Sequence, residues 1–141
     1  TITPKLKLLF NDKKILWGDI IDENDNTENL SELASLLWDK RIDGDIDLCD
    51  ISLRERNVLS GFNAKFLYKN KVANTVTACE TCVLFDKKRN RNKNELLLCG
   101  SYPLDYNFGK LKHEYLIGMS VPPIMTARIA DEIYDQWISK F

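Results

Sequence analysis

The C-terminal stretch of this sequence carries its clearest pattern and constrains the fold most. Pro122 and Pro123 stand where a helix can begin, because the first helical turn needs no backbone N–H from a proline. After them, apolar residues recur at helical spacing, at Ile124, Ile129, Ile133, Trp137 and Phe141. The pattern predicts a long amphipathic helix over about 122–140. Periodicity leaves two alternatives open, a helix packed on its own domain and a helix packed on a separate partner.

Shorter patterns before that helix predict an α+β domain. Leucines at helical spacing predict a helix near 30–41. The polar tract 87–94, with five basic residues and three asparagines, predicts an exposed, mobile hairpin tip or loop. We therefore expect a small domain with a curled antiparallel β-sheet, one helix near 30–41 and the long C-terminal helix. The expected strands lie within 43–50, after a turn at Asp43-Gly44, and over 64–68, 72–78 and 82–86.

The charges are divided unevenly along the chain. Between Asp19 and Asp50, eleven acidic residues stand against two basic ones. Between Ile51 and Lys93, ten basic residues stand against three acidic ones. A basic segment of this kind suits a surface that faces a polyanion such as nucleic acid. The alternative is a solvated face whose charges balance those of its neighbour.

The four cysteines suggest little chemistry by their spacing. Cys79 and Cys82 form one C-x-x-C, whereas structural zinc sites usually combine two such pairs, or one pair with two histidines. The other candidate ligands, Cys49, Cys99 and His113, stand at irregular spacing. We expect reduced thiols, no metal site and a surface position for His113. A zinc-stabilised module that uses the C-x-x-C stays as an alternative.

Length and composition suit one soluble domain. The chain has 141 residues, of which 44% are apolar and 29% are charged, so a core of its own is expected. No segment resembles a signal peptide, and no apolar run approaches the roughly 20 residues that a membrane span needs. The first residue is Thr1 rather than a methionine, and we expect the chain to be part of a larger protein.

The segment Ile117-Gly118-Met119-Ser120-Val121-Pro122-Pro123 resembles the last conserved block of the DNA (cytosine-5) methyltransferases. Ala73-Asn74-Thr75-Val76-Thr77-Ala78 resembles the short strand that ends the target-recognition region of that family. Glu95, eight residues before Pro103, resembles a further block, and the segment 17–21 resembles the start of the region. The similarity spans nearly the whole chain. It is strongest at the closing block and weakest over 22–70, where the family varies with its DNA target.

This resemblance implies a division of labour. Enzymes of the family transfer a methyl group from S-adenosylmethionine to C5 of a cytosine that is flipped out of duplex DNA. Residues 1–116 would form the target-recognition domain, and residues 117–141 would form a closing block and helix that pack on a catalytic domain. The Pro-Cys dipeptide that carries the family's nucleophile is absent from this sequence. We therefore expect no catalytic residue in this chain, no activity from it alone, and a cofactor held mainly by the catalytic domain.

The resemblance also assigns DNA contacts, in two recognition loops at about 59–65 and 79–82 and in the strand between them. Hydroxyl and ammonium groups suit phosphates, whereas amide and carboxylate groups suit base edges. An aromatic side chain could fill or flank the space that the flipped base leaves. The DNA-binding candidates are Phe62 as the aromatic, Asn63 and Glu80 as base readers, and Lys65, Thr75 and Thr77.

The closing block supplies the candidate cofactor contacts, which are Gly118, Met119, Ser120 and Val121. Two positions depart from the family pattern. Met119 stands where the family usually has an asparagine, and Asn94 stands where an arginine usually precedes the glutamate. The first change puts a side-chain hydrogen bond in doubt but leaves backbone contacts intact.

Three other hypotheses fit the same residues: the small subunit of a split methyltransferase, a stand-alone DNA-binding domain without catalysis, and the zinc module. For the leading hypothesis we expect double-stranded DNA and a catalytic domain or subunit as partners, with no membrane involved. A cytoplasmic location in a prokaryote or phage system follows. We also expect homodimers, formed through the apolar face of the C-terminal helix.

Overall fold

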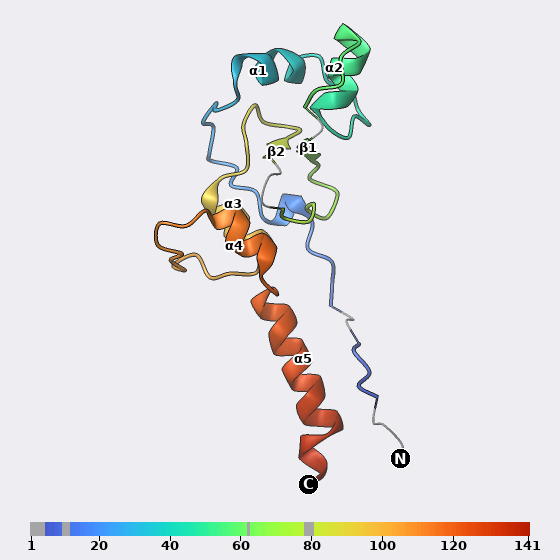
Figure 1. The fold of residues 1–141 in the computed structure, drawn as a ribbon, viewed down its shortest axis with the longest axis vertical. Coiled ribbons are helices and arrows are strands. Elements are labelled where there is room, and N and C mark those ends of the chain that lie inside the picture. The colour runs from blue at the N-terminus through green and yellow to red at the C-terminus, as the bar shows by residue number, and fades with distance from the viewer. Residues whose placement is uncertain (1–4, 10–11, 62, 78–80) are drawn as a thin grey trace.

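The computed structural model describes residues 5–9, 12–61, 63–77 and 81–141 (Figure 1). A body holds the elements up to α4, and α5 leaves it as a long rod with the N-terminal segment beside it (Figure 1). In chain order the elements are η1 (Trp17–Asp19), α1 (Glu32–Trp38), α2 (Leu48–Arg56), β1 (Ala64–Leu67), β2 (Thr81–Leu84), α3 (Lys93–Cys99), α4 (His113–Met119), α5 (Pro123–Gln136) and η2 (Ile138–Lys140).

The sheet differs from the predicted one. Among the described residues it has two strands, β1 and β2, which run parallel with Ala64 opposite Thr81 and Leu67 opposite Leu84. The sequence located both strands, but the predicted curled antiparallel sheet is wrong. A parallel pair needs a long connection. Here residues 68–80 separate the end of β1 from the start of β2. The strand predicted over 72–78 is wrong for its described residues, 72–77, which form no strand.

The strand predicted within 43–50 is reduced to a single antiparallel bridge between Asp47 and Lys65, because α2 begins directly after it. The Asp47 carboxylate accepts hydrogen bonds from the backbone N–H groups of Cys49 (2.8 Å) and Asp50 (3.1 Å). An acidic residue that caps a helix in this way satisfies donors that the first turn leaves unpaired. The alternation of polar and apolar residues in this segment therefore marks a helix start. The helix then buries Leu48 and Ile51.

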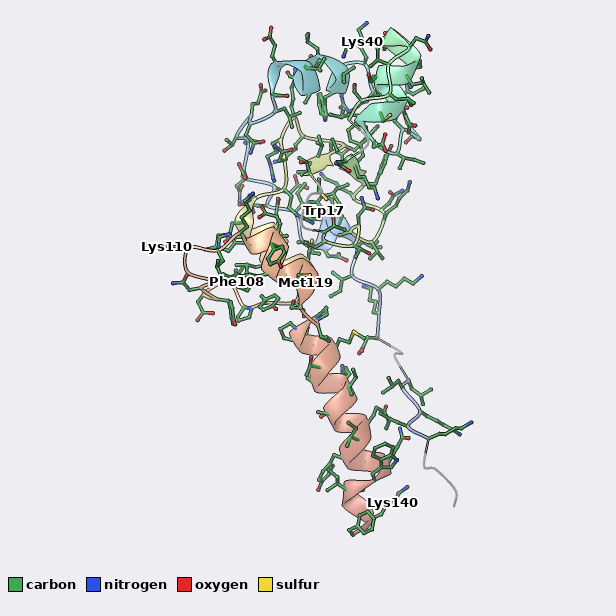
Figure 2. All side chains as sticks on the ribbon, viewed as in Figure 1. Trp17, Lys40, Phe108, Lys110, Met119 and Lys140 are labelled. Carbon is green, nitrogen blue, oxygen red and sulfur yellow. The ribbon has the colours of Figure 1, made fainter. Side chains whose placement is uncertain are left out.

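The body contains three clusters of buried residues. The first surrounds Trp17, whose side chain is 1% exposed and lies inside the body (Figure 2). The second joins α1 and α2 to the two strands, and the third joins α3 to α4. The helix predicted near 30–41 is confirmed as α1, which Ser31 caps through the N–H of Ala34 at 3.3 Å. Two of the three clusters therefore include residues of the small sheet, and the third lies between α3 and α4.

The tract 87–94 is not an exposed loop, so that prediction is wrong. Arg89 and Glu95 are each 1% exposed and form a two-pronged ion pair, with N···O distances of 2.6 and 2.8 Å. Arg89 also donates to the carbonyl oxygens of Asp22 and Asp25. The hydrogen bonds to Glu95 raise the pKa of Arg89 despite its burial. A buried charge is tolerable when it is paired and hydrogen-bonded, and composition alone cannot reveal such a partner.

Other basic side chains also pair with the acidic segment. The shortest N···O distances are 2.6 Å for Lys69 to Glu23, 2.7 Å for Lys88 to Asp39 and 2.7 Å for Arg54 to Asp45. These pairs favour the alternative in which the two segments balance each other. The uneven charge therefore gives little support to nucleic-acid binding.

The long C-terminal helix is confirmed as α5. All of its residues are described, and none of them is buried. The N-terminal segment lies along it: the Gln136 amide donates to the Lys7 carbonyl at 2.7 Å and accepts from the Lys7 N–H at 3.0 Å. Arg128 pairs with Asp12 at 2.8 Å. Across the described residues, no helix combines the length and apolar character that a membrane crossing requires.

Candidate functional site

A groove of about 550 Å³ opens where α5 leaves the body; we call it the junction groove. Met119 lies near this point, at the end of α4, and Lys140 lies at the far end of the rod (Figure 2). The lining is mainly apolar with polar groups among it. The lining residues are Asp12, Lys13, Ile15, Ile20, Val72, Ala73, Asn74, Thr75, Val76, Leu98, Cys99, Gly100, Ser101, Ile117, Gly118, Ser120, Pro122, Ile124, Met125 and Arg128.

A glycine in the closing block allows two walls of this groove to meet. A Cβ atom at Gly118 would lie 2.8 Å from the carbonyl oxygen of Val76 and 3.4 Å from the Cα of Thr77. Both neighbours are backbone atoms, which cannot swing aside as a flexible side chain can. Any side chain at this position would push the closing block away from 72–77.

Hydrogen bonds fix the direction in which α5 leaves the groove. The hydroxyl and the N–H of Ser120 both donate to the carbonyl oxygen of Ile117, at 2.8 and 3.2 Å. The Ser101 hydroxyl accepts from the N–H of Ile124, in the first turn of α5, at 3.2 Å. That turn would otherwise leave this N–H unpaired. The start of the helix is therefore attached to the body, whereas the rest of the helix extends away from it.

The predicted cofactor residues divide into two pairs. Gly118 and Ser120 line the junction groove. Met119 and Val121 are 71% and 57% exposed and do not line it. Because the Ser120 hydroxyl already donates to Ile117, its oxygen is the free acceptor at this wall. Of the four predicted cofactor residues, the groove therefore brings together Gly118 and Ser120.

The predicted DNA contacts lie in two places. Thr75 lines the junction groove, and both Thr75 and Thr77 are exposed. Lys65 is exposed on β1, opposite Cys82 in the strand register, and Asn63 is exposed in the turn before that strand. The two threonines thus share a segment with the groove, whereas Asn63 and Lys65 belong to the sheet. Phe62, Cys79 and Glu80 lie outside the described residues.

Sequence reasoning missed the part that the N-terminal segment plays. Asp12, Lys13 and Ile15 contribute to the lining, and Arg128 reaches across from α5 to pair with Asp12. No periodic pattern in this segment predicts such contacts. The pairing of Asp12 with Arg128, more than a hundred residues apart, is visible only in three dimensions.

Neither thiol nor metal chemistry is indicated for this groove. Cys99 lines it, but burial raises the pKa of its thiol and so disfavours the reactive thiolate. Within the part of the chain that the structure describes, no three His, Cys, Asp or Glu side chains are grouped so as to hold a metal ion. His113 is half-buried at the start of α4, with its ring 5.5 Å from that of Phe108.

No protein-family model, curated protein or solved structure matches this chain. The motifs and the way in which the fold brings them together are therefore the basis of the functional assignment.

Proposed function

We propose that this chain is the target-recognition part of a DNA (cytosine-5) methyltransferase and works with a catalytic domain that supplies the nucleophile. When bound, S-adenosylmethionine would provide the methyl group, and the chain would contribute Gly118 and Ser120 to one edge of its site. Thr75 would hold a DNA phosphate through its hydroxyl. The chain's task is to position DNA, since the Pro-Cys dipeptide of the family is absent from it.

One observation carries this proposal. The closing block and the segment 72–77 stand far apart in the sequence, and each resembles a different block of that family. They line the same groove and approach so closely that only glycine fits at position 118. A methyltransferase needs its DNA-holding and cofactor-holding segments side by side, because the methyl donor must reach the flipped base. This juxtaposition supports the two resemblances together rather than one by one.

The apolar surface of α5 gives further support. Ile124, Tyr134 and Ile138, in α5 and the turn that follows it, are each more than half exposed. Exposed apolar side chains of this kind suit a helix that packs on another domain. In the proposed enzyme this surface packs on the catalytic domain, which agrees with the way the helix extends from the body.

The decisive test is methyl transfer to mixed-sequence duplex DNA. The full-length gene product, this chain alone, and this chain mixed with a separately expressed catalytic region should be assayed with labelled S-adenosylmethionine. We expect activity at C5 of cytosine from the full product, none from the chain alone, and recovery in the mixture. Activity only with a separately encoded protein would identify a split enzyme. A full product that binds duplex DNA without methylating it would overturn the enzymatic part of the proposal.

A Thr75→Ala variant sharpens that test. It should weaken duplex binding without changing the DNA sequence preference, because phosphate contacts position the protein and carry no sequence information directly. Ser139→Ala, near the end of the rod, serves as the matched control and should leave binding unchanged. Equal affinity of both variants would remove Thr75 from the interface.

A further inference from the structure

A second cleft, of about 460 Å³, is lined by residues of α1, α2, β1 and β2; we call it the α1–β2 cleft. It brings together five parts of the chain, represented by Asn29, Leu48, Ser60, Thr81 and Asn90. Ser60 comes from the first predicted recognition loop and Thr81 from the second. The cleft therefore lies where base recognition is expected on the proposed function, although no sequence pattern predicts a cavity there.

The chemistry of the lining limits what can enter. The floor includes the buried side chains of Leu37, Leu48 and Val83. None of the lining residues that the structure describes carries a charge. That lining is unusual for a chain in which 29% of residues are charged. It disfavours a phosphate, a metal ion or an acidic peptide, because each would need an opposite charge, and it suits a neutral ligand that can form hydrogen bonds.

Asn90 lines this cleft and carries a side-chain group without a hydrogen-bond partner among the described residues. Its backbone N–H donates to the Asn29 side-chain oxygen at 2.8 Å, and its carbonyl accepts from Arg89 at 3.1 Å. The backbone is therefore held from both sides. The side-chain oxygen of Asn90 is buried without a hydrogen-bond partner among the described residues. Such groups are rare in folded proteins and call for an explanation.

The loop beside the cleft is held in a defined position. Gly61 has φ = +84°, and a Cβ atom there would lie 3.0 Å from the Cβ of Leu48. The Ser60 hydroxyl is hydrogen-bonded to that of Ser52 at 2.8 Å. These contacts hold Ser60 and Gly61 against α2, so this wall of the cleft exists before a ligand enters.

We infer that the α1–β2 cleft receives a neutral nucleobase and that Asn90 recognises its edge. A base is a flat heterocycle that presents both donors and acceptors, and asparagine amides pair with adenine through two hydrogen bonds. Apolar walls suit the ring, and a cleft of this volume lies within the range of small-ligand sites. The inference rests on the proposed function for its ligand, because DNA brings the base. It adds Asn29, Thr81 and Asn90 as specificity-determining residues.

Saturation-transfer NMR with the four free nucleosides, each at millimolar concentration, tests this inference directly. We expect one nucleoside to give signals that weaken roughly tenfold in Asn90→Ala, in line with the loss of one base contact. Asn70→Ala is the matched control, because Asn70 is exposed in the turn after β1 and does not line the cleft. Thr81→Val provides a second variant at the cleft if Asn90→Ala fails to fold. The absence of binding by any nucleoside, or equal binding by the wild type and both cleft variants, would overturn the inference.

A second arm separates this inference from the proposed function. In duplex binding, Asn90→Ala should keep its affinity for random sequence and lose preference for the target. Nucleoside binding without duplex binding would leave the cleft in place and refute the DNA-recognition role. If the wild type and Asn90→Ala instead bind duplex DNA with the same sequence preference, the DNA-binding role stands and the role of Asn90 in base recognition is refuted.

Discussion

The body and the α5 rod of this protein are held in different ways. The body buries three clusters of apolar side chains, and inside it Arg89 and Glu95 are nine-tenths or more removed from solvent. The rod has no buried residue in α5 and meets the N-terminal segment through exposed side chains. Packing inside the body should therefore fix its shape, whereas the rod depends on contacts that solvent competes for. Substitutions can test this contrast.

The largest effect is expected from Glu95→Ala in the body. It would leave Arg89 charged and buried without its partner, which typically costs about 3–5 kcal/mol of unfolding free energy. Chemical denaturation would measure it. Lys88→Ala is the matched control, since its pair with Asp39 lies nearer to solvent and should contribute at most about 1 kcal/mol. Equal losses of unfolding free energy in the two variants would mean that the buried Arg89–Glu95 pair contributes no more to stability than the exposed pair.

A smaller effect is expected from Gly118→Ala, where the body meets the rod. The new methyl group would meet the Val76 carbonyl oxygen, and overpacking of this kind costs about 1–3 kcal/mol. Thermal unfolding gives the loss. Met119→Ala changes an exposed neighbour at the same helix end and should be nearly neutral. A neutral Gly118→Ala would show that the closing block can move away from 72–77 at little cost.

The next effect in size is expected from acid, which should lower the unfolding free energy of the body. Hydrogen bonds, first from Asn92, lower the pKa of Asp25. At Asp45, burial opposes ionisation, but hydrogen bonds from Arg54 and Ile42 outweigh it and the pKa falls. Both carboxyls ordinarily titrate at 3.8, so their contribution is complete above that pH and is lost as pH falls through the lower folded values. Denaturation series from pH 7 to pH 2 should show stability declining below about pH 4. Asp25→Asn should flatten that decline.

The smallest effect on stability is expected on the rod. Ile138→Ser alters a side chain that is 56% exposed and should change the unfolding free energy by less than about 0.5 kcal/mol. Ile133→Ser, on the apolar face through which the homodimer is predicted, should abolish that dimer, measured by sedimentation over a range of concentrations. Leu97→Ala, inside the body, should cost about 2–5 kcal/mol by comparison. If the wild-type chain stays monomeric at every concentration, the predicted homodimer is wrong.

The sequence predicted the features that local patterns determine. Leucine spacing located α1, and the proline pair with its apolar repeat located α5. Strand positions near β1 and β2 were also predicted, but their relative direction depends on how the intervening chain returns, which no local pattern records. Arg89 was assigned to solvent for a similar reason, because its partners Asp22 and Asp25 are distant in sequence.

The candidate site follows the same division. Gly118 and Thr75 were singled out as motif members, and both line the junction groove. Asp12 and Arg128 were not, because their contact joins opposite ends of the described chain. Asn90 stood in a tract whose composition suggested only solvent exposure, and its fixed backbone with an unused amide oxygen appears only after folding.

The pairing of Lys7 with Gln136 implies a competition. The Gln136 amide satisfies both backbone hydrogen-bonding groups of Lys7, as a neighbouring strand would. Any protein that takes over this side of α5 must first displace the N-terminal segment. Association would therefore be slowed by the time that the segment needs to detach, and the Lys7 amide would exchange its hydrogen with solvent faster in the complex than in the free chain.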